Sequence, residues 1–210
     1  MNYRNDDDYI TPDLLTVELN EQKGRRRDMW ITAVLVLICL MVVWTKFVWL
    51  EPIQVSGDSM NDTLVNGNML VLDRLASPNY GDVVVFTKGG TPYIKRVIAL
   101  GGDSVMIMGG NLYLKKSGQP EYVIQNEEYA KGRTYMYYYD GLSRVHTEER
   151  TVFEVEEGEF FAMGDNREGS IDCRDPRLGG AISLNYLDGV VHKFFIDHKD
   201  SPIAGLYKFL

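Results

Sequence analysis

The chain has 210 residues, 45% of them hydrophobic, which is enough for one principal domain but not for two large ones. Its 22 lysine and arginine residues face 30 aspartate and glutamate residues, so the formal net charge is −8. Proteins that bind nucleic acid neutralise phosphates with an excess of basic groups, so this charge argues against nucleic acid as a partner. We expect Cys39 and Cys173 to be free thiols, because Cys39 lies inside a long apolar segment.

The N-terminal part of the chain consists of a polar tail and an apolar segment. Residues 1–27 are polar, with no sustained helical pattern, and are predicted to form a flexible tail. Residues 28–50 include the run MWITAVLVLICLMVVWTKFVWL, in which Lys46 is the only charged residue. A helix of about 20 apolar residues can cross a membrane, and no small-x-small cleavage site follows this run. The segment is therefore predicted to be a retained transmembrane anchor rather than a signal peptide.

The orientation of the anchor follows from the basic residues at its two ends. Four of the five residues KGRRR, residues 23–27, are basic, whereas Lys46 is the only basic residue near the other end. Flanking segments rich in lysine and arginine remain in the cytoplasm. The N-terminus is therefore predicted to be cytoplasmic, with everything beyond the anchor on the outer side of the membrane.

Beyond the anchor, the sequence is typical of a β protein. Short runs such as NMLVLDRL, DVVVFTK, PYIKRVIAL and GVVHKFFI alternate with glycine-containing turns. They predict a mostly β domain, an antiparallel sheet or barrel-like structure, made of residues 51–116 and 158–197. Residues 117–157 contain YMYYYDG and are predicted to be a small β-rich insertion in which tyrosines pack across strands. Residues 198–210 would form a C-terminal tail.

Among the candidate reactive groups, a lysine lies in a more distinctive setting than any histidine. The three histidines, His146, His192 and His198, show no metal-ligand spacing, so neither a metal nor another cofactor is expected. A Ser-His-Asp triad is compatible with any order along the chain, but no histidine lies in a distinctive motif. Lys95 lies in the middle of TPYIKRVIAL, where burial would lower its pKa and leave an amine able to accept a proton. On this local pattern alone, an edge-strand lysine that reaches water is the simpler interpretation.

Three motifs behind the anchor together resemble a known family. SGDSM, YIKR followed by GGD, and GDNREGSIDCR occur in this order. They resemble type I signal peptidase, the membrane-anchored Ser/Lys protease of bacteria, and the resemblance covers the chain except for the tail and the insertion. It implies a single-pass serine endopeptidase of the bacterial cell membrane that removes signal peptides from secretory preproteins after small-x-small sites such as Ala-x-Ala. The lipid bilayer and the protein export machinery would be further partners.

The resemblance also implies roles for individual residues. Ser59 would be the nucleophile, Lys95 the general base, and Ser170 the residue whose hydroxyl orients the lysine amine. The backbone N–H of Ser59 would contribute to the oxyanion hole, and Gly57 stands where some relatives have a serine. An ion-pair shell, which we interpret as structural, would be formed by Asp165, Arg167, Asp172, Arg174 and Arg96.

The chain departs from the family pattern at two positions. Asp62 replaces a turn proline and is predicted to cap the turn with its carboxylate. Cys173 stands where serine is common and is predicted to be a small packing residue rather than a nucleophile.

Other functions remain open on the sequence. A catalytically silent, membrane-anchored assembly factor for surface-fibre (pilus) subunits would use the same fold, and Asp62 leaves room for it, although both Ser59 and Lys95 are present. The anchor argues against another Ser/Lys protease, a soluble self-cleaving repressor. An anchored structural β domain would have no reason to carry the two serines and the lysine at the motif positions. A general and a dedicated substrate range are both compatible with these motifs.

Overall fold

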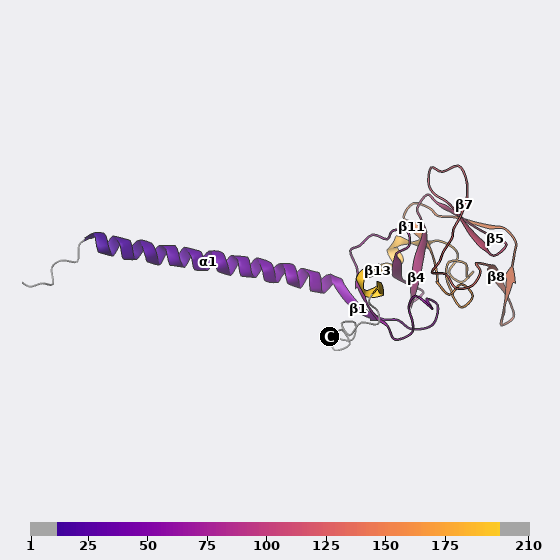
Figure 1. Ribbon diagram of the computed structural model, residues 1–210, viewed down its shortest axis with the longest axis horizontal. Helices are drawn as coiled ribbons and strands as arrows, with labels where there is room; N and C mark the ends of the chain where they lie inside the picture. Colours follow the sequence, from indigo (N-terminus) through magenta and orange to yellow (C-terminus); the bar gives the residue numbers. More distant parts are fainter. Residues whose placement is uncertain (1–11, 198–210) are drawn as a thin grey trace, which may run out of the picture. The chain divides into compact units, whose positions relative to one another are not determined.

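The computed structural model describes residues 12–197, and its two compact units divide between Val48 and Trp49 (Figure 1). The predicted C-terminal tail, residues 198–210, and the first eleven residues lie outside this range. The described part of the first unit belongs to helix α1 (Pro12–Trp49), whose last residue is counted with the second unit. The second unit contains the β domain.

Helix α1 has the character expected of a membrane anchor. Its stretch Gln22–Trp44 has a mean hydropathy of 1.9, and within the described residues it is the one helix long and apolar enough to cross a membrane. Large apolar side chains are exposed all along this stretch, as Trp30 and Leu40 illustrate. A helix that exposes apolar groups in this way suits contact with lipid.

The helix begins earlier than the sequence pattern predicts. Residues 12–27 were expected to belong to a flexible tail, yet they are helical, and the helix ends at Trp49 because Leu50 already begins a strand. Proline is well accommodated in the first helical turn, which fits the start at Pro12. The residues that follow include leucine, glutamate, lysine and arginine, which have high helix propensity, and extending an existing helix costs little free energy.

The β domain contains a large antiparallel sheet, so the predicted mostly β fold is confirmed. Among the described residues this sheet has seven strands in the order β1-β2-β13-β3-β4-β11-β12, with every neighbouring pair antiparallel. Its strands are β1 (Leu50–Gln54), β2 (Met69–Asp73), β3 (Val83–Lys88), β4 (Thr91–Leu100), β11 (Glu159–Met163), β12 (Ile182–Ser183) and β13 (Leu187–Val191). A 3₁₀-helix η2 (Leu184–Tyr186) precedes β13, and a short helix α2 (Lys193–Asp197) follows it.

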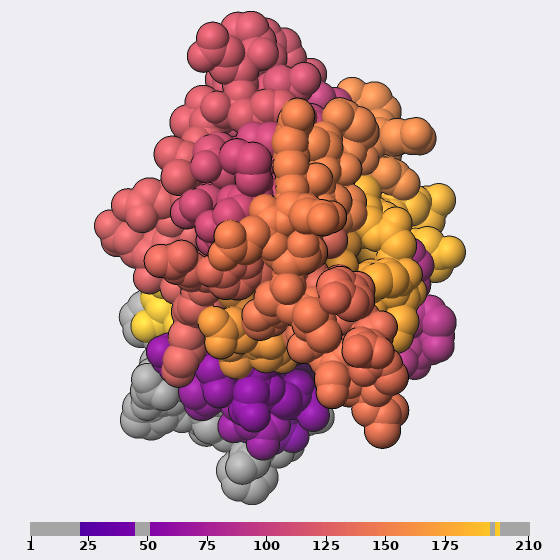
Figure 2. Space-filling model, turned by 90° about the vertical axis from the view of Figure 1, so that its right-hand side faces the viewer, coloured from indigo at the N-terminus to yellow at the C-terminus, as the bar shows by residue number. Residues whose placement is uncertain are grey.

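The predicted insertion does not form a separate unit. A second sheet, in the order β10-β5-β6-β7, contains β5 (Ser104–Met108), β6 (Asn111–Lys115), β7 (Val123–Ile124) and β10 (Thr151–Glu154). It therefore crosses the boundary predicted at residue 117, since β10 pairs with β5. The hairpin of β8 (Met136–Asp140) and β9 (Ser143–Thr147) lies between β7 and β10 in the chain. Figure 2 shows a face of the domain on which these segments, drawn from pink to orange, form one continuous surface.

Two hydrophobic clusters hold the domain together. The larger core joins both sheets, because Val105 and Leu112 of the second sheet are buried in the same cluster as Val97 and Phe160 of the first. The smaller core consists of Val55, Met60, Leu64, Leu70, Leu72, Val83, Val85 and Val191. Met60 and Leu64 anchor the loop after β1 on this cluster, and the amide of Leu64 donates to the carbonyl of Met60 at 2.8 Å. The loop that contains Ser59 is thereby fixed against the sheet.

A tight turn places β4 beside β3. Gly89 and Gly90 connect the two strands with φ values of +60° and +78°. Positive φ at both central residues is the geometry of a type I′ hairpin turn, which glycine adopts without strain. The hairpin fixes the register, so that Lys95 lies opposite Val84.

Replacing Phe160 tests whether the shared core stabilises the domain. Its side chain is fully buried, and its ring meets that of Phe86 edge to face at a centroid distance of 5.7 Å. Phe160→Ala is expected to lower the free energy of unfolding by about 3–5 kcal/mol, because it removes apolar contacts and leaves a cavity. Pulse proteolysis in urea would measure the loss. The exposed Tyr138→Ala should change stability by less than about 0.5 kcal/mol, and equal losses in the two variants would contradict the assignment of the core.

Candidate active site

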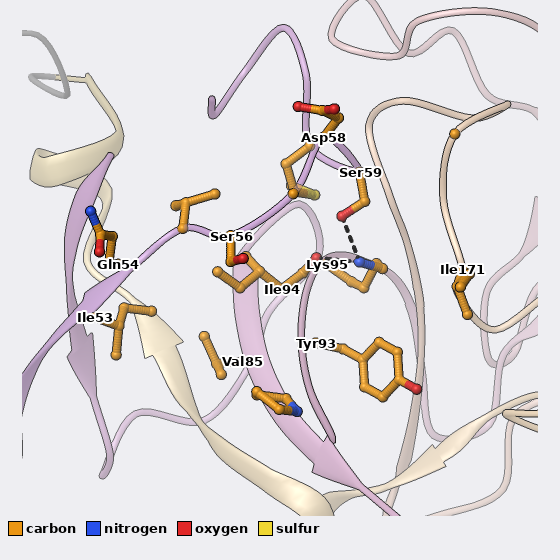
Figure 3. A pocket seen from close by; sticks show the side chains of 15 residues that line it. Ile53, Gln54, Ser56, Asp58, Ser59, Val85, Tyr93, Ile94, Lys95 and Ile171 are labelled. Carbon is orange, nitrogen blue, oxygen red and sulfur yellow. Dashed lines mark hydrogen bonds between the residues drawn. The ribbon is translucent and has the colours of Figure 1, made fainter. Parts of the chain in front are cut away.

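The structure brings the predicted nucleophile and the predicted base together. The amine Nζ of Lys95 lies 2.8 Å from Ser59 Oγ and 2.7 Å from the carbonyl oxygen of Ile94, within hydrogen-bonding distance of both (Figure 3). Ser59 comes from the loop between β1 and β2, whereas Lys95 comes from the middle of β4. A hydroxyl and an amine at this distance can exchange a proton directly.

Lys95 is not an edge-strand lysine. Strand β4 lies between β3 and β11, and the Lys95 residue is only 3% exposed. Burial lowers the pKa of Lys95 from 10.5 to about 8, although the carboxylates of Asp172 and Asp165 act in the opposite direction. The neutral amine that a general base requires therefore becomes populated as the pH approaches 8.

A cavity of about 530 Å³ opens beside these two side chains. Figure 3 shows Val85, Ile94 and Tyr93 on the sheet side of the cavity and Ile171 on a separate loop. The lining residues are Ile53, Gln54, Val55, Ser56, Gly57, Asp58, Ser59, Met60, Val85, Pro92, Tyr93, Ile94, Lys95, Gly169 and Ile171. Most of this lining was not predicted, because it combines four segments that are distant in the sequence.

The backbone around Ser59 has one conformation that requires glycine and one close approach. Gly57 has φ +90°, and its N–H donates to Asn66 Oδ1 at 3.1 Å, so that amide is already engaged. A Cβ atom on Gly164 would lie 2.5 Å from the carbonyl oxygen of Ser59 and would also collide with the side chain of Ser170. Glycine at position 164 therefore allows the third motif to pack against the loop that contains Ser59.

Ser170 packs against Gly164 but does not make the predicted contact with Lys95. Its side chain is completely buried, and its hydroxyl makes no hydrogen bond of normal geometry within the described residues. The hydroxyl is close enough to Asp172 to help lower the pKa of that carboxyl group. The predicted hydrogen bond between Ser170 and Lys95 is absent, because the lysine amine is turned toward Ser59 and the Ile94 carbonyl.

Four residues of the predicted ion-pair shell form two ion pairs with each other. Arg96 donates to both carboxylate oxygens of Asp165 at 2.9 and 2.6 Å, and Arg174 does the same to Asp172 at 2.9 and 2.8 Å. Burial acts to raise the pKa of Asp172, but Arg174 and the amide of Gly164 hold it below its ordinary value. These bidentate contacts agree with the structural role assigned to them.

Arg167 has a partner that the motifs did not identify. Its guanidinium forms an ion pair with Glu127, which lies in the predicted insertion, and Nε donates to the carbonyl oxygen of Gly164 at 3.1 Å. Arg167 is 1% exposed, so its charge depends on Glu127, whose side chain is 9% exposed. Nothing in the sequence spacing connects Glu127 with Arg167, since they lie in different segments and meet only in the fold.

The tyrosines do more than pack across strands. Tyr137 and Tyr139 lie on the same face of β8, with ring centroids 6.0 Å apart, and both hydroxyls donate to Asp175, at 3.2 and 2.9 Å. Tyr135 stacks instead on His146, at 5.6 Å. The β8–β9 hairpin is thus attached to the segment that follows Ser170, a contact that sequence reasoning missed.

Asp62 and Cys173, the two departures from the family pattern, make contacts that support the fold. Asp62 accepts a hydrogen bond from Lys131 Nζ at 3.1 Å on the surface. Cys173 is buried, accepts a hydrogen bond from the amide of Ala162, and has its pKa raised to about 12 by burial, as suits a packing residue. Among the residues that the structure describes, no group of three or more potential ligands could hold a metal ion, and His198 lies outside them.

Comparison with known proteins identifies the family. Residues 27–196 match the family model described as signal peptidase, peptidase S26. The chain is 31% identical over 162 residues to Signal peptidase I S of Bacillus subtilis (strain 168), covering 74% of this chain and 83% of that protein. It is 29% identical over 169 residues to Signal peptidase I of Bacillus licheniformis, covering 77% of this chain and 85% of that protein. The chain therefore belongs to the signal peptidase family, peptidase S26.

Proposed function

We propose that this peptidase is a type I signal peptidase that uses Ser59 as nucleophile and Lys95 as general base. The observation that carries the proposal is the 2.8 Å contact between Lys95 Nζ and Ser59 Oγ in a buried setting. The long apolar helix fits a membrane-anchored member of the family. No histidine is needed, because a lysine with a pKa of about 8 can accept the serine proton.

The reaction would proceed through an acyl-enzyme. The neutral amine has one lone pair, which would accept the Ser59 proton, while one of its N–H groups donates to the Ile94 carbonyl and fixes its direction. Oγ attacks the carbonyl carbon of the scissile peptide, and Lys95 then gives the proton to the leaving amine. The same amine removes a proton from water, which attacks the ester and regenerates the free serine.

The cavity suits a substrate with small residues next to the cleavage site. In an extended peptide, alternate side chains point to the same side, so the two small residues of Ala-x-Ala would enter the cavity together. Ile53, Val85 and Ile94 give it an apolar lining close to Ser59. We assign preproteins with signal peptides as the substrates, general or dedicated.

The anchor would bring enzyme and substrate together. Ser59 follows the last helical residue, Trp49, by ten positions, and a signal peptide held in the bilayer presents its cleavage site near the same membrane plane. Confining both partners to that plane raises their effective concentration. In this proposal the N-terminus is cytoplasmic, the β domain lies on the outer side, and the export machinery supplies the substrate.

Replacing Ser59 tests the nucleophile. Ser59→Ala is expected to reduce cleavage of a purified Ala-x-Ala preprotein in detergent micelles by about a thousandfold or more, because alanine has no oxygen to attack the peptide beside Lys95. Mass spectrometry of the new N-terminus would identify the cut. The exposed Ser77→Ala should cleave like the parent protein.

Cleavage by Ser59→Ala at the parent rate would refute this nucleophile. If the folded parent protein cleaves neither this preprotein nor surface-fibre subunits, the silent assembly factor becomes the better interpretation.

The pH dependence tests the base. Only neutral Lys95 can accept a proton, so kcat/KM should rise with increasing pH, about tenfold per unit at low pH, and level off above the pKa of about 8. Lys95→Arg should be inactive throughout this range, because a guanidinium group does not deprotonate. The control is Lys115→Arg, which makes the same substitution on β6 and should retain the parent pH profile. An active Lys95→Arg enzyme, or a profile without an inflection near pH 8, would contradict the assignment.

A further inference from the structure

The segment Glu127–Gly132 runs beside the loop that carries the third motif. The amide of Lys131 donates to the carbonyl oxygen of Asp165 at 2.7 Å, and the amide of Arg167 donates back to the carbonyl oxygen of Lys131 at 3.0 Å. These two bonds form a parallel bridge between Lys131 and Asn166. The segment belongs to the tyrosine-rich region that the motifs do not include.

The other side of Asn166 holds the nucleophile loop. Its amide donates to the carbonyl oxygen of Ser59 at 3.0 Å, and its side-chain amide donates to the carbonyl oxygen of Asp58 at 3.1 Å. Asp58 also accepts from the amide of Asn61 at 3.2 Å. One residue, Asn166, therefore lies between the segment Glu127–Gly132 and the backbone of Ser59.

Side chains of the segment reach two arginines that support the site. Glu127 accepts from the buried Arg167, which in turn donates to the carbonyl oxygen of Gly164. The ring of Tyr129 lies 4.2 Å from the guanidinium of Arg96, which binds Asp165 through two hydrogen bonds. The hydroxyl of Tyr129 donates to Glu127 at 2.6 Å, so the two side chains are joined to each other.

These contacts lie outside the cavity. Outside the segment, Glu127 contacts Arg167 and Tyr129 contacts Arg96, the neighbour of Lys95. Lys131 also binds Asp62 at the surface, and no residue of the segment lines the cavity beside Ser59. The segment can therefore affect the reaction only by holding other residues in place. A displacement of about 1 Å between reacting groups can cost about a hundredfold in rate, so such support has a measurable consequence.

We propose that Glu127 and Tyr129 are positioning residues, which hold Asn166, and through it the backbone of Ser59, at the distance from Lys95 that proton transfer requires. The proposal rests on the proposed function for its effect on cleavage. The effect on the backbone does not depend on that function.

Two variants and two matched controls test the proposal in the full chain in detergent micelles. Glu127→Gln removes the charge opposite Arg167 and keeps the shape of the side chain, with the adjacent, exposed Glu128→Gln as its control. Tyr129→Leu removes the ring from Arg96 and the hydroxyl from Glu127 without leaving a buried charge unpaired. Tyr129 is 36% exposed, so this variant should fold even where Glu127→Gln does not. Tyr138→Leu, on the exposed side of β8, is its control.

Amide hydrogen exchange, followed by NMR, gives the first readout. Loosening the segment should speed exchange at the amides of Lys131 and Arg167. If the segment also positions the serine, the amides of Asn166 and Asn61 should exchange about tenfold faster or more, while amides of β3 and β4 keep their rates. Both controls should leave all of these amides unchanged.

Kinetics with the Ala-x-Ala preprotein give the second readout. Each variant should lower kcat about 10- to 100-fold and leave KM unchanged, because the cavity is intact and only the alignment of Ser59 is disturbed. Unchanged exchange at Asn166 and Asn61 in the folded variants would overturn the proposal, whatever the rate of cleavage. If the parent protein does not cleave, the proposed function fails, and the exchange measurement still decides whether the segment positions Ser59.

Discussion

The buried amine of Lys95 is the constraint on which the site depends. A lysine in the interior of a sheet is costly as a cation, and the same desolvation lowers its pKa to about 8 and makes it a base. Its two close oxygen atoms, on Ser59 and Ile94, give the amine a direction. The rest of the domain holds the loop that contains Ser59 within hydrogen-bonding distance of this amine.

Buried ion pairs help to fix the position of the segments around the site. Asp165, Asp172 and Arg167 are almost inaccessible to water, and each is paired with a residue from another part of the chain or from the same tight loop. Such pairs contribute little net stability compared with apolar residues of similar size, but removing one partner costs about 3–5 kcal/mol. Their value lies in geometry, because a bidentate contact fixes both the distance and the orientation of two segments.

The N-terminal helix and the β domain differ in how they treat their apolar side chains. The helix exposes apolar side chains along a stretch long enough to cross a membrane, while the domain buries its own in two clusters. The smaller cluster includes Met60 and Leu64 of the loop that contains Ser59. Their burial fixes the position of this loop. In the proposed function, the closeness of Ser59 to the helix in sequence suits a substrate that is itself held in the membrane.

Local patterns in the sequence determined the anchor, the antiparallel β character, the type I′ turn before β4 and the family motifs. Each depends on neighbouring residues, through apolar run length, strand alternation or glycine at positive φ. The helical start at Pro12 follows from local helix propensity, although the sequence pattern did not predict it. The single core across the predicted insertion and the partnership of Glu127 with Arg167 were decided by tertiary structure. The burial of Lys95 belongs with them, because the sequence alone also allowed an exposed edge strand. Only the packing of β4 between β3 and β11 removes the amine from water and makes it a base.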